Sequence, residues 1–233
     1  MLAPTAGPWR TATVREVGHP HAHGVVLRLD LPDRVHHLPG QHYVLRLTAE
    51  DGYTATRSYS LASAPSDPLL ELYVEELPDG EVSPYLAQAV RPGDQLEVRG
   101  PVGGWFVWDA TGPALGLAGG SGVVPLVAML RHAVDVGRLG LLRLAVAART
   151  LDRLPYAREL IEAGALIALS REAGPHGRAA GRLLAAEVAP LLDGAATCYV
   201  CGSAPFATGA SDLLVGLGVD VSRVRVERFG ASG

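Results

Sequence analysis

The stretch Leu117-Ala118-Gly119-Gly120-Ser121-Gly122-Val123-Val124-Pro125 decides the fold of the second half of this 233-residue chain. An apolar run, 113–118, precedes it and an amphipathic run, 124–136, follows it, so the pattern predicts a buried strand, a glycine turn and a helix start. Because glycines let backbone N–H groups approach a ligand closely, such a turn suits a phosphate at the helix N-terminus. An ordinary tight strand–helix connection is the alternative, since Pro125 stands where the usual dinucleotide fingerprint has its third glycine.

Downstream of Trp108, apolar strand patterns alternate with helix patterns. The alternation predicts an α/β domain over residues 109–233, with a parallel five-stranded, Rossmann-like sheet covered by helices on both faces. Ligands of such sheets bind at the carboxyl ends of the strands. The glycine turn, Arg149-Thr150, Ser170-Arg171 and Cys201-Gly202 all fall at such ends, which favours a nucleotide site there. The expected strands are 115–118, 141–147, 165–169, 197–200 and 224–228, and the expected helices are 124–136, 155–163, 181–188 and 205–217.

The first 108 residues contain short strand patterns at short spacing, separated by turns rich in Gly, Pro and Asp. This arrangement predicts a small antiparallel barrel over residues 1–108. One short helix is expected at 83–90, with Ser83 as its N-cap and Pro84 at its first position. The expected strands are 11–17, 25–31, 41–47, 57–62, 69–76 and 95–99.

Composition excludes several classes of protein. The formal net charge is −4 and no basic tail is present, so nucleic acid is not an expected partner. No apolar run of about 18 residues indicates a membrane span, and residues 1–10 lack the pattern of a signal peptide. We therefore expect a cytoplasmic protein. All 20 basic residues are arginines, so a phosphate site must use guanidinium groups and backbone amides.

Two groups of metal-ligating residue types lie outside this pattern. Cys198 and Cys201 are too few for an iron–sulfur cluster. They lie on a predicted strand, where positions i and i+3 face opposite ways, so neither a disulfide nor a shared metal is expected. His19, His21 and His23 on a strand would place three imidazoles on one face, which suits zinc or copper. Because Pro20 and Gly24 predict a turn there, we expect no metal site.

Six short motifs follow one another along the chain: Arg57-Ser58-Tyr59-Ser60, Gly80-Glu81-Val82-Ser83, Gly100-Pro101-Val102-Gly103-Gly104-Trp105-Phe106, the glycine turn through Pro125, Cys201-Gly202-Ser203 and Glu227-Arg228-Phe229. Together they resemble the ferredoxin–NADP(+) reductase family, and most closely its bacterial stand-alone members without a fused iron–sulfur or globin domain. The resemblance spans about residues 11–229. It implies an antiparallel Greek-key barrel that binds FAD, followed by the NADP-binding α/β domain.

The resemblance implies that Arg57 holds the flavin pyrophosphate and that Tyr59 stacks on the isoalloxazine ring. These two residues are i and i+2, so a strand presents both to one ligand. A half-buried strand tyrosine is the alternative for Tyr59. Glu75 and Phe229 depart from the plant-type pattern, which has lysine and tyrosine at these positions. The implied flavin residues are Arg57, Ser58, Tyr59, Ser60, Tyr73, Val74, Glu75, Gly80, Val82, Ser83, Ser121 and Phe229.

The resemblance also implies that Ser170 and Arg171 bind the 2′-phosphate of NADPH. An arginine cluster favours NADPH over NADH, for which an acidic residue would be expected. Glu172 is expected to face away, and a solvated loop with scattered arginines is the alternative to a phosphate site. The implied nucleotide residues are Gly120, Gly122, Arg149, Thr150, Ser170, Arg171, Arg178, Arg182, Cys201, Gly202 and Ser203.

Ser60, Cys201 and Glu227 match the residues that the family places around the reacting atoms. The implied activity is hydride transfer from NADPH to FAD, followed by transfer of single electrons to a ferredoxin, a flavodoxin or an oxygenase or oxidase component. An NADH-dependent flavin or quinone reductase is an alternative. A non-catalytic subunit that binds flavin or nucleotide and senses redox state is another, although such a sensor would not need the three residues that position the hydride.

Overall fold

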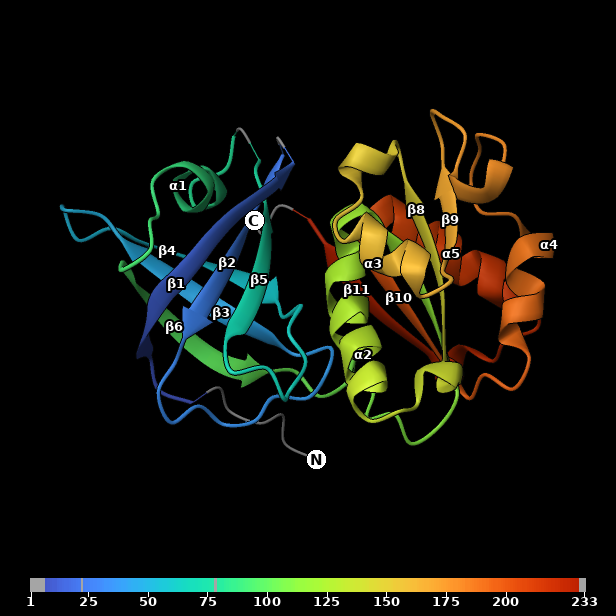
Figure 1. Cartoon of the computed structure of the whole chain (residues 1–233), viewed down its shortest axis with the longest axis horizontal. Coiled ribbons are helices and arrows are strands. Elements are labelled where there is room, and N and C mark those ends of the chain that lie inside the picture. Colours follow the sequence, from blue (N-terminus) through green and yellow to red (C-terminus); the bar gives the residue numbers. More distant parts are fainter. Residues whose placement is uncertain (1–6, 22, 78, 231–233) are drawn as a thin grey trace. The chain divides into compact units, whose positions relative to one another are not determined.

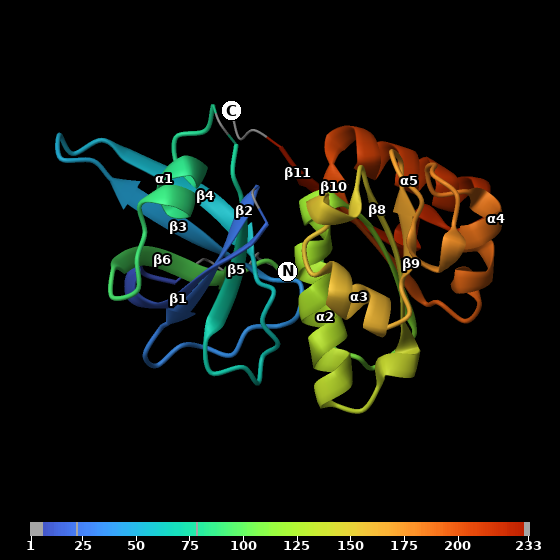
Figure 2. The same cartoon turned by 45° about the horizontal axis from the view of Figure 1, so that its top comes forward.

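The computed structural model describes residues 7–21, 23–77 and 79–230. Its contacts separate the chain into two units that divide between Val107 and Trp108. The first unit is built from strands and one short helix, and the second alternates strands with helices (Figures 1 and 2).

The first unit is a six-stranded antiparallel barrel with the strand order β4-β3-β6-β1-β2-β5. A bridge between Leu61 and Leu72 and a bond from Ala62 N–H to the Glu71 carbonyl join the end of β4 to β5. Alternating apolar residues, such as Val25, Leu27 and Leu29 of β2, fill the interior. The prediction of an antiparallel Greek-key barrel is confirmed. Its strands are β1 (Arg10–His21), β2 (Gly24–Asp30), β3 (His42–Thr48), β4 (Thr54–Ser60), β5 (Leu70–Glu75) and β6 (Gln95–Val102).

The short helix α1 (Ser83–Gln88) begins differently from the prediction. Ser83 is the first helical residue, and the N-cap position belongs to Val82, whose side chain cannot cap. The Ser83 hydroxyl instead accepts a hydrogen bond from the backbone N–H of Leu77 over 3.1 Å. Ser83 therefore ties the preceding loop to the helix rather than capping it.

The second unit contains a five-stranded parallel sheet, as predicted, and its strand order is β11-β10-β7-β8-β9. The helices α2 and α3 lie on one face of this sheet and α4 and α5 on the other (Figures 1 and 2). The order reverses between β7 and β10, which makes their carboxyl ends the switch point where such sheets bind ligands. The strands are β7 (Ala114–Gly119), β8 (Leu142–Ala148), β9 (Leu166–Leu169), β10 (Thr197–Ser203) and β11 (Val224–Phe229), and the helices are α2 (Val124–Asp135), α3 (Ala157–Glu162), α4 (Ala185–Val188) and α5 (Ala204–Gly216).

Two local predictions are wrong. The helix expected over 181–188 starts only at Ala185 and continues as a 3-10 turn over Ala189–Leu192. Strand β1 extends through His21, so His19 and His21 lie on a strand rather than in a turn. Within the described part of the chain, no group of three or more His, Cys, Asp or Glu side chains is placed to hold a metal ion.

No helix among the described residues is long and apolar enough to cross a membrane.

Candidate functional site

The glycine stretch forms a 3-10 turn, η1 (Gly120–Val123), that continues directly into α2. Gly120 has φ +56°, and a Cβ on it would meet no heavy atom within 4 Å. A Cβ on Gly122 would lie 2.3 Å from the carbonyl oxygen of Cys201. Gly122 is therefore required by the close approach of η1 to β10, whereas Gly120 supplies a left-handed conformation facing open space.

Cys201 and Glu227 are neighbours at the switch point, because they are in register on the parallel strands β10 and β11. Cys201 is fully buried. Burial, together with the nearby Glu227 carboxylate, raises the pKa of the Cys201 thiol well above its usual value. Burial also raises the pKa of Glu227 to about 7. The thiol is thus neutral at physiological pH, and the carboxyl group titrates near neutrality.

Cys198 lies on the same strand and is also buried, and both thiols are free. The prediction that both cysteines lie on one strand, at positions i and i+3, is confirmed.

The residues predicted to bind the 2′-phosphate lie where β8 and β9 end. Ser170 N–H donates to the Ala148 carbonyl over 3.0 Å, and Arg171 N–H donates to the Arg149 carbonyl over 2.9 Å. The pairing of the two strands thus continues beyond their ends and brings Arg149 and Arg171 to one edge. Ser170 and both arginines are exposed. An exposed edge with two guanidinium groups fits a phosphate ester.

Glu172 was expected to face away from the phosphate site, and its orientation relative to Arg149 and Arg171 stays a prediction. Its Oε1 accepts a hydrogen bond from Leu151 N–H over 2.7 Å. The carboxylate thereby holds the loop after β8, including Thr150, against the segment after β9. An acidic side chain consequently belongs to the same edge as Arg149 and Arg171.

Arg178 was predicted to belong to the phosphate cluster, but its guanidinium is fully engaged. Its five N–H donors contact both carboxylate oxygens of Glu187 and the carbonyls of Ala179, Gly181 and Arg182. Its side chain is only 14% exposed, and it lowers the pKa of Glu187 through their hydrogen bonds. These contacts fold the loop before α4 and argue against a phosphate role for Arg178. Arg182 is exposed.

On the barrel, Arg57, Ser58, Tyr59 and Ser60 form the last part of β4. Tyr59 is half-buried and packs against the barrel core. Burial raises its pKa to about 12, so its hydroxyl is neutral. Ser60 is buried at the last position of the strand, where an end or bend was expected. Arg57 and Tyr59 lie on one side of β4, and this combination of a cation and an aromatic ring fits a flavin nucleotide.

Three residues of β5, Tyr73, Val74 and Glu75, were also predicted to border the flavin. Tyr73 is buried, and a Cβ on Gly24 would lie 2.2 Å from its hydroxyl oxygen. Its ring also contacts the ring of His21, with centroids 5.6 Å apart. Val74 is fully buried in the barrel core, whereas Glu75 is exposed. Val74 therefore packs in the barrel core and Tyr73 against Gly24 and His21, and the flavin roles of Tyr73, Val74 and Glu75 stay predictions.

The remaining predicted residues lie at the ends of elements. The Ser203 hydroxyl accepts a bond from Phe206 N–H over 3.4 Å as the N-cap of α5. Phe229 is half-buried at the last position of β11, in register with Ser203. Their cofactor roles, and those of Gly80, Val82, Ser121 and Gly202, stay predictions. Sequence reasoning missed the roles of Glu81 and Glu187, which pair with the predicted Arg57 and Arg178, and of Tyr53, whose hydroxyl contacts Glu81. Tyr53 and Glu187 belong to no motif, and Glu81 lies in the motif Gly80-Glu81-Val82-Ser83 without an assigned role.

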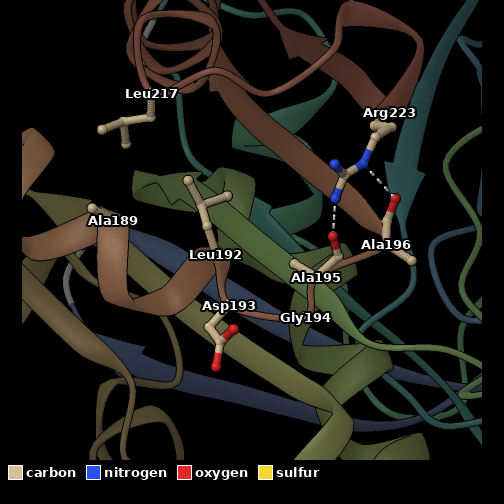
Figure 3. A pocket seen from close by; sticks show the side chains of 8 residues that line it. All are labelled: Ala189, Leu192, Asp193, Gly194, Ala195, Ala196, Leu217 and Arg223. Atoms are coloured by element: carbon tan, nitrogen blue, oxygen red, sulfur yellow. Dashed lines mark hydrogen bonds between the residues drawn. The ribbon is translucent and has the colours of Figure 1, made fainter.

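A cavity of about 730 Å³ lies at the opposite end of the parallel sheet, where the strands β10 and β11 begin (Figure 3). The Arg223 guanidinium reaches along it and donates to the carbonyls of Ala195 and Ala196, just before β10 begins. Because nucleotides bind at the carboxyl ends of such strands, this cavity is not the predicted nucleotide site. It is lined by Ala189, Leu192, Asp193, Gly194, Ala195, Ala196, Leu217 and Arg223.

Comparisons with known proteins agree with this arrangement. Residues 15–107 match the family model described as an oxidoreductase FAD-binding domain. The chain is 33% identical to the glycine betaine monooxygenase reductase subunit of Chromohalobacter salexigens, over 83% of this chain and 56% of that protein. It is 30% identical to the ferredoxin–NAD(P)(+) reductase component of the naphthalene 1,2-dioxygenase/salicylate 5-hydroxylase systems of a Ralstonia species, over 89% of this chain and 65% of that protein. The chain thus spans somewhat more than half the length of these relatives.

Solved structures share the fold over nearly the whole chain. The flavohem-like FAD/NAD binding domain of nitric oxide dioxygenase from Vibrio cholerae has a TM-score of 0.84 and 25% identity, covering 95% of this chain and 98% of that one. A ferredoxin NADP+ reductase from Neisseria gonorrhoeae, with bound FAD and NADP, has a TM-score of 0.82 and 17% identity, covering 95% and 99%. Residues 15–107 thus carry the FAD-binding domain of an oxidoreductase, and most of the chain is similar to reductase components of oxygenase systems. The solved structures show the same two-part fold.

Proposed function

We propose that this chain is an FAD-dependent NAD(P)H oxidoreductase that delivers electrons to a protein acceptor, either a ferredoxin, a flavodoxin or an oxygenase component. The observation that carries the proposal is the common face of Arg57 and Tyr59 on β4, inside the segment matched by the FAD-binding model. The relatives named as reductase components of oxygenase systems support the class of acceptor. A cytoplasmic location is part of the proposal, and two unpaired cysteines are typical of a reducing compartment.

In this proposal residues 1–108 bind FAD. Arg57 binds the pyrophosphate, because a guanidinium fork matches two phosphate oxygens. Tyr59 covers part of the isoalloxazine ring with the face that the barrel core leaves free. Ser58, the backbone of Tyr73 and Val74, and Gly80, Val82 and Ser83 add further flavin contacts.

Residues 109–233 bind the nicotinamide nucleotide in the same proposal. Arg149 and Arg171 would hold the 2′-phosphate of NADPH with the Ser170 hydroxyl, and Arg182 would add a further positive charge. Glu172 keeps the two loops that carry these groups together through its bond to Leu151 N–H. Gly120, Gly122 and Ser121 would receive the nicotinamide side of the nucleotide at the switch point.

The chemistry of such a reductase is supplied by the cofactors, since hydride enters the flavin from reduced nicotinamide and electrons leave it one at a time. The protein supplies orientation and excludes water. Cys201 offers a neutral, buried thiol beside the nicotinamide site, and Glu227 holds or releases a proton next to it. Ser60 would orient the flavin from the barrel, and Phe229 would shield it.

NADH is a second candidate donor, because Glu172 places a carboxylate at the edge where an acidic residue would bind an unphosphorylated ribose.

A steady-state assay tests the proposed electron transfer. The purified holoprotein is mixed with NADPH or NADH and one of three acceptors: a ferredoxin coupled to cytochrome c, free flavin, or a quinone. The proposal predicts the highest turnover with ferredoxin. Faster turnover with free flavin or quinone would support the flavin or quinone reductase instead. No turnover with any acceptor, despite bound flavin, would support the redox-sensing subunit.

A further inference from the structure

Arg57 contacts an acidic side chain that no motif assigned to it. Its Nη2 lies 3.5 Å from Oε2 of Glu81, and its Nη1 donates to the Thr56 carbonyl over 2.8 Å. The Tyr53 hydroxyl is within hydrogen-bond distance of both carboxylate oxygens of Glu81, at 3.3 and 3.4 Å. Thus β4, the loop before α1 and the turn between β3 and β4 (Figure 1) each contribute one side chain to a single cluster.

From this cluster we infer that Glu81 is an internal competitor for the flavin pyrophosphate, and that its charge lowers the affinity of the barrel for FAD. The inference rests on the proposed function, because it requires Arg57 to bind the pyrophosphate. It assigns Glu81 a role in setting flavin affinity, which is distinct from holding the flavin.

The competition follows from the chemistry of the guanidinium group. A carboxylate and a pyrophosphate are both anionic oxygen acceptors, and a guanidinium group binds either. If the pyrophosphate displaces Glu81, the existing ion pair must break. If Glu81 stays, two anions lie beside the same cation and repel each other. In both cases the negative charge of Glu81 opposes binding.

The exposure of the pair limits the size of this effect. The side chain of Arg57 is 33% exposed and that of Glu81 is 56% exposed. Exposed ion pairs contribute little, because solvent and salt screen them, so the expected change in Kd is about two- to fivefold. Tyr53 acts through Glu81, since its hydroxyl donates to the carboxylate.

The chain offers a matched control two residues away. Asp79 is exposed in the same loop and carries the same charge. A variant Asp79→Asn therefore changes net charge and local composition as Glu81→Gln does, without removing the ion pair to Arg57. Riboflavin provides the matched ligand, because it has the isoalloxazine ring and no phosphate.

The test is a binding titration of the full chain after removal of its flavin. The Kd of FAD and of riboflavin is measured by flavin fluorescence for the wild type, Glu81→Gln and Asp79→Asn, at low and high salt. We expect Glu81→Gln to bind FAD about two- to fivefold more tightly at low salt, with a smaller gain at high salt. Its riboflavin affinity, and both affinities of Asp79→Asn, should match those of the wild type. In an Arg57→Gln background the gain should disappear.

The failures are distinguishable. A wild-type chain that binds no FAD overturns the proposed function and the inference together. A wild-type chain that binds FAD, with a Glu81→Gln variant that binds it equally or more weakly, overturns the inference alone, because Glu81 would then be neutral toward the flavin or hold it. A gain that is equal for riboflavin would also contradict competition for the pyrophosphate.

Discussion

The backbone N–H of Arg171 donates to the carbonyl of Arg149 over 2.9 Å, so two exposed arginines leave neighbouring strands at the same edge of the sheet. This relationship gives the proposed NADPH site its charge. The main chain fixes the spacing of the two residues, whereas their side chains remain free to close on a phosphate.

Replacement of Arg171 by alanine should therefore weaken the binding of NADPH and not that of NADH. We expect Arg171→Ala to raise the KM for NADPH about tenfold or more, the usual effect of losing a charge-assisted hydrogen bond. The KM for NADH should change by less than about twofold, because NADH lacks the phosphate that this contact recognises. Steady-state kinetics with both nucleotides measure the two values. Equal effects on both would refute the assignment of the 2′-phosphate to this edge.

Arg178 should behave as a structural residue. Its five N–H donors are all engaged within the loop before α4 and by Glu187. We expect Arg178→Ala to lower the free energy of unfolding by about 2–3 kcal/mol, because the partly buried Glu187 carboxylate loses its guanidinium partner and keeps only the bond from Leu184 N–H among its hydrogen bonds to described residues. The exposed Arg182→Ala should change stability by less than about 0.5 kcal/mol.

Chemical denaturation gives both values, and nucleotide kinetics provide the control. An Arg178→Ala variant that is as stable as wild type and selectively loses NADPH affinity would show that Arg178 binds the phosphate.

Gly120 and Gly122 should differ in how well they tolerate replacement by alanine. A Cβ on Gly122 would meet the Cys201 carbonyl oxygen at 2.3 Å, so either η1 or β10 must shift. We expect Gly122→Ala to cost about 2 kcal/mol or more of stability, as overpacking does. Gly120→Ala meets no atom and should cost only about 1 kcal/mol for its positive φ. Urea denaturation of the two variants compares them, and a Gly122→Ala variant as stable as wild type would show that the turn stands further from β10.

Glu227 should make stability depend on pH. Its folded-state pKa of about 7 is above the ordinary value of 4.5, so the folded chain favours the protonated form. For a raised carboxyl pKa, stability is highest at low pH and is lost as pH rises from about 4.5 to 7. We expect Glu227→Gln to be more stable than wild type by about 1–3 kcal/mol at pH 8, with the difference vanishing toward pH 4.5. Denaturation at both pH values measures it, and a constant difference would show that burial does not perturb this carboxyl group.

The arrangement of strands was predictable because hydrophobic spacing is a local property. Alternating residues such as Val25, Leu27 and Leu29 indicate a half-buried antiparallel strand, and the apolar run before Gly119 indicates a strand buried on both faces. The change from one pattern to the other also indicated a division near Trp108. The fold followed from these periodicities and from the order of the motifs.

Individual side-chain partners were not predictable, because each depends on residues that only the fold brings together. Both Arg171 and Arg178 were expected near the phosphate, yet Arg178 turns inward to Glu187 nine positions away and Arg171 stays exposed. Glu172 likewise finds Leu151 only because β8 and β9 pair in parallel. The Ser83 hydroxyl could cap α1 or bind Leu77, and the geometry of the loop decides between them.

The central claim is that NADPH reduces a flavin held by this chain. An anaerobic titration of the purified holoprotein with NADPH, followed by its visible absorption spectrum, tests this claim most directly. We predict a flavin absorption band that one equivalent of NADPH bleaches completely. After mixing, NADH should bleach the same band at a lower rate than NADPH. A protein without a flavin band after reconstitution with FAD, or a band that neither nucleotide bleaches, would contradict the account.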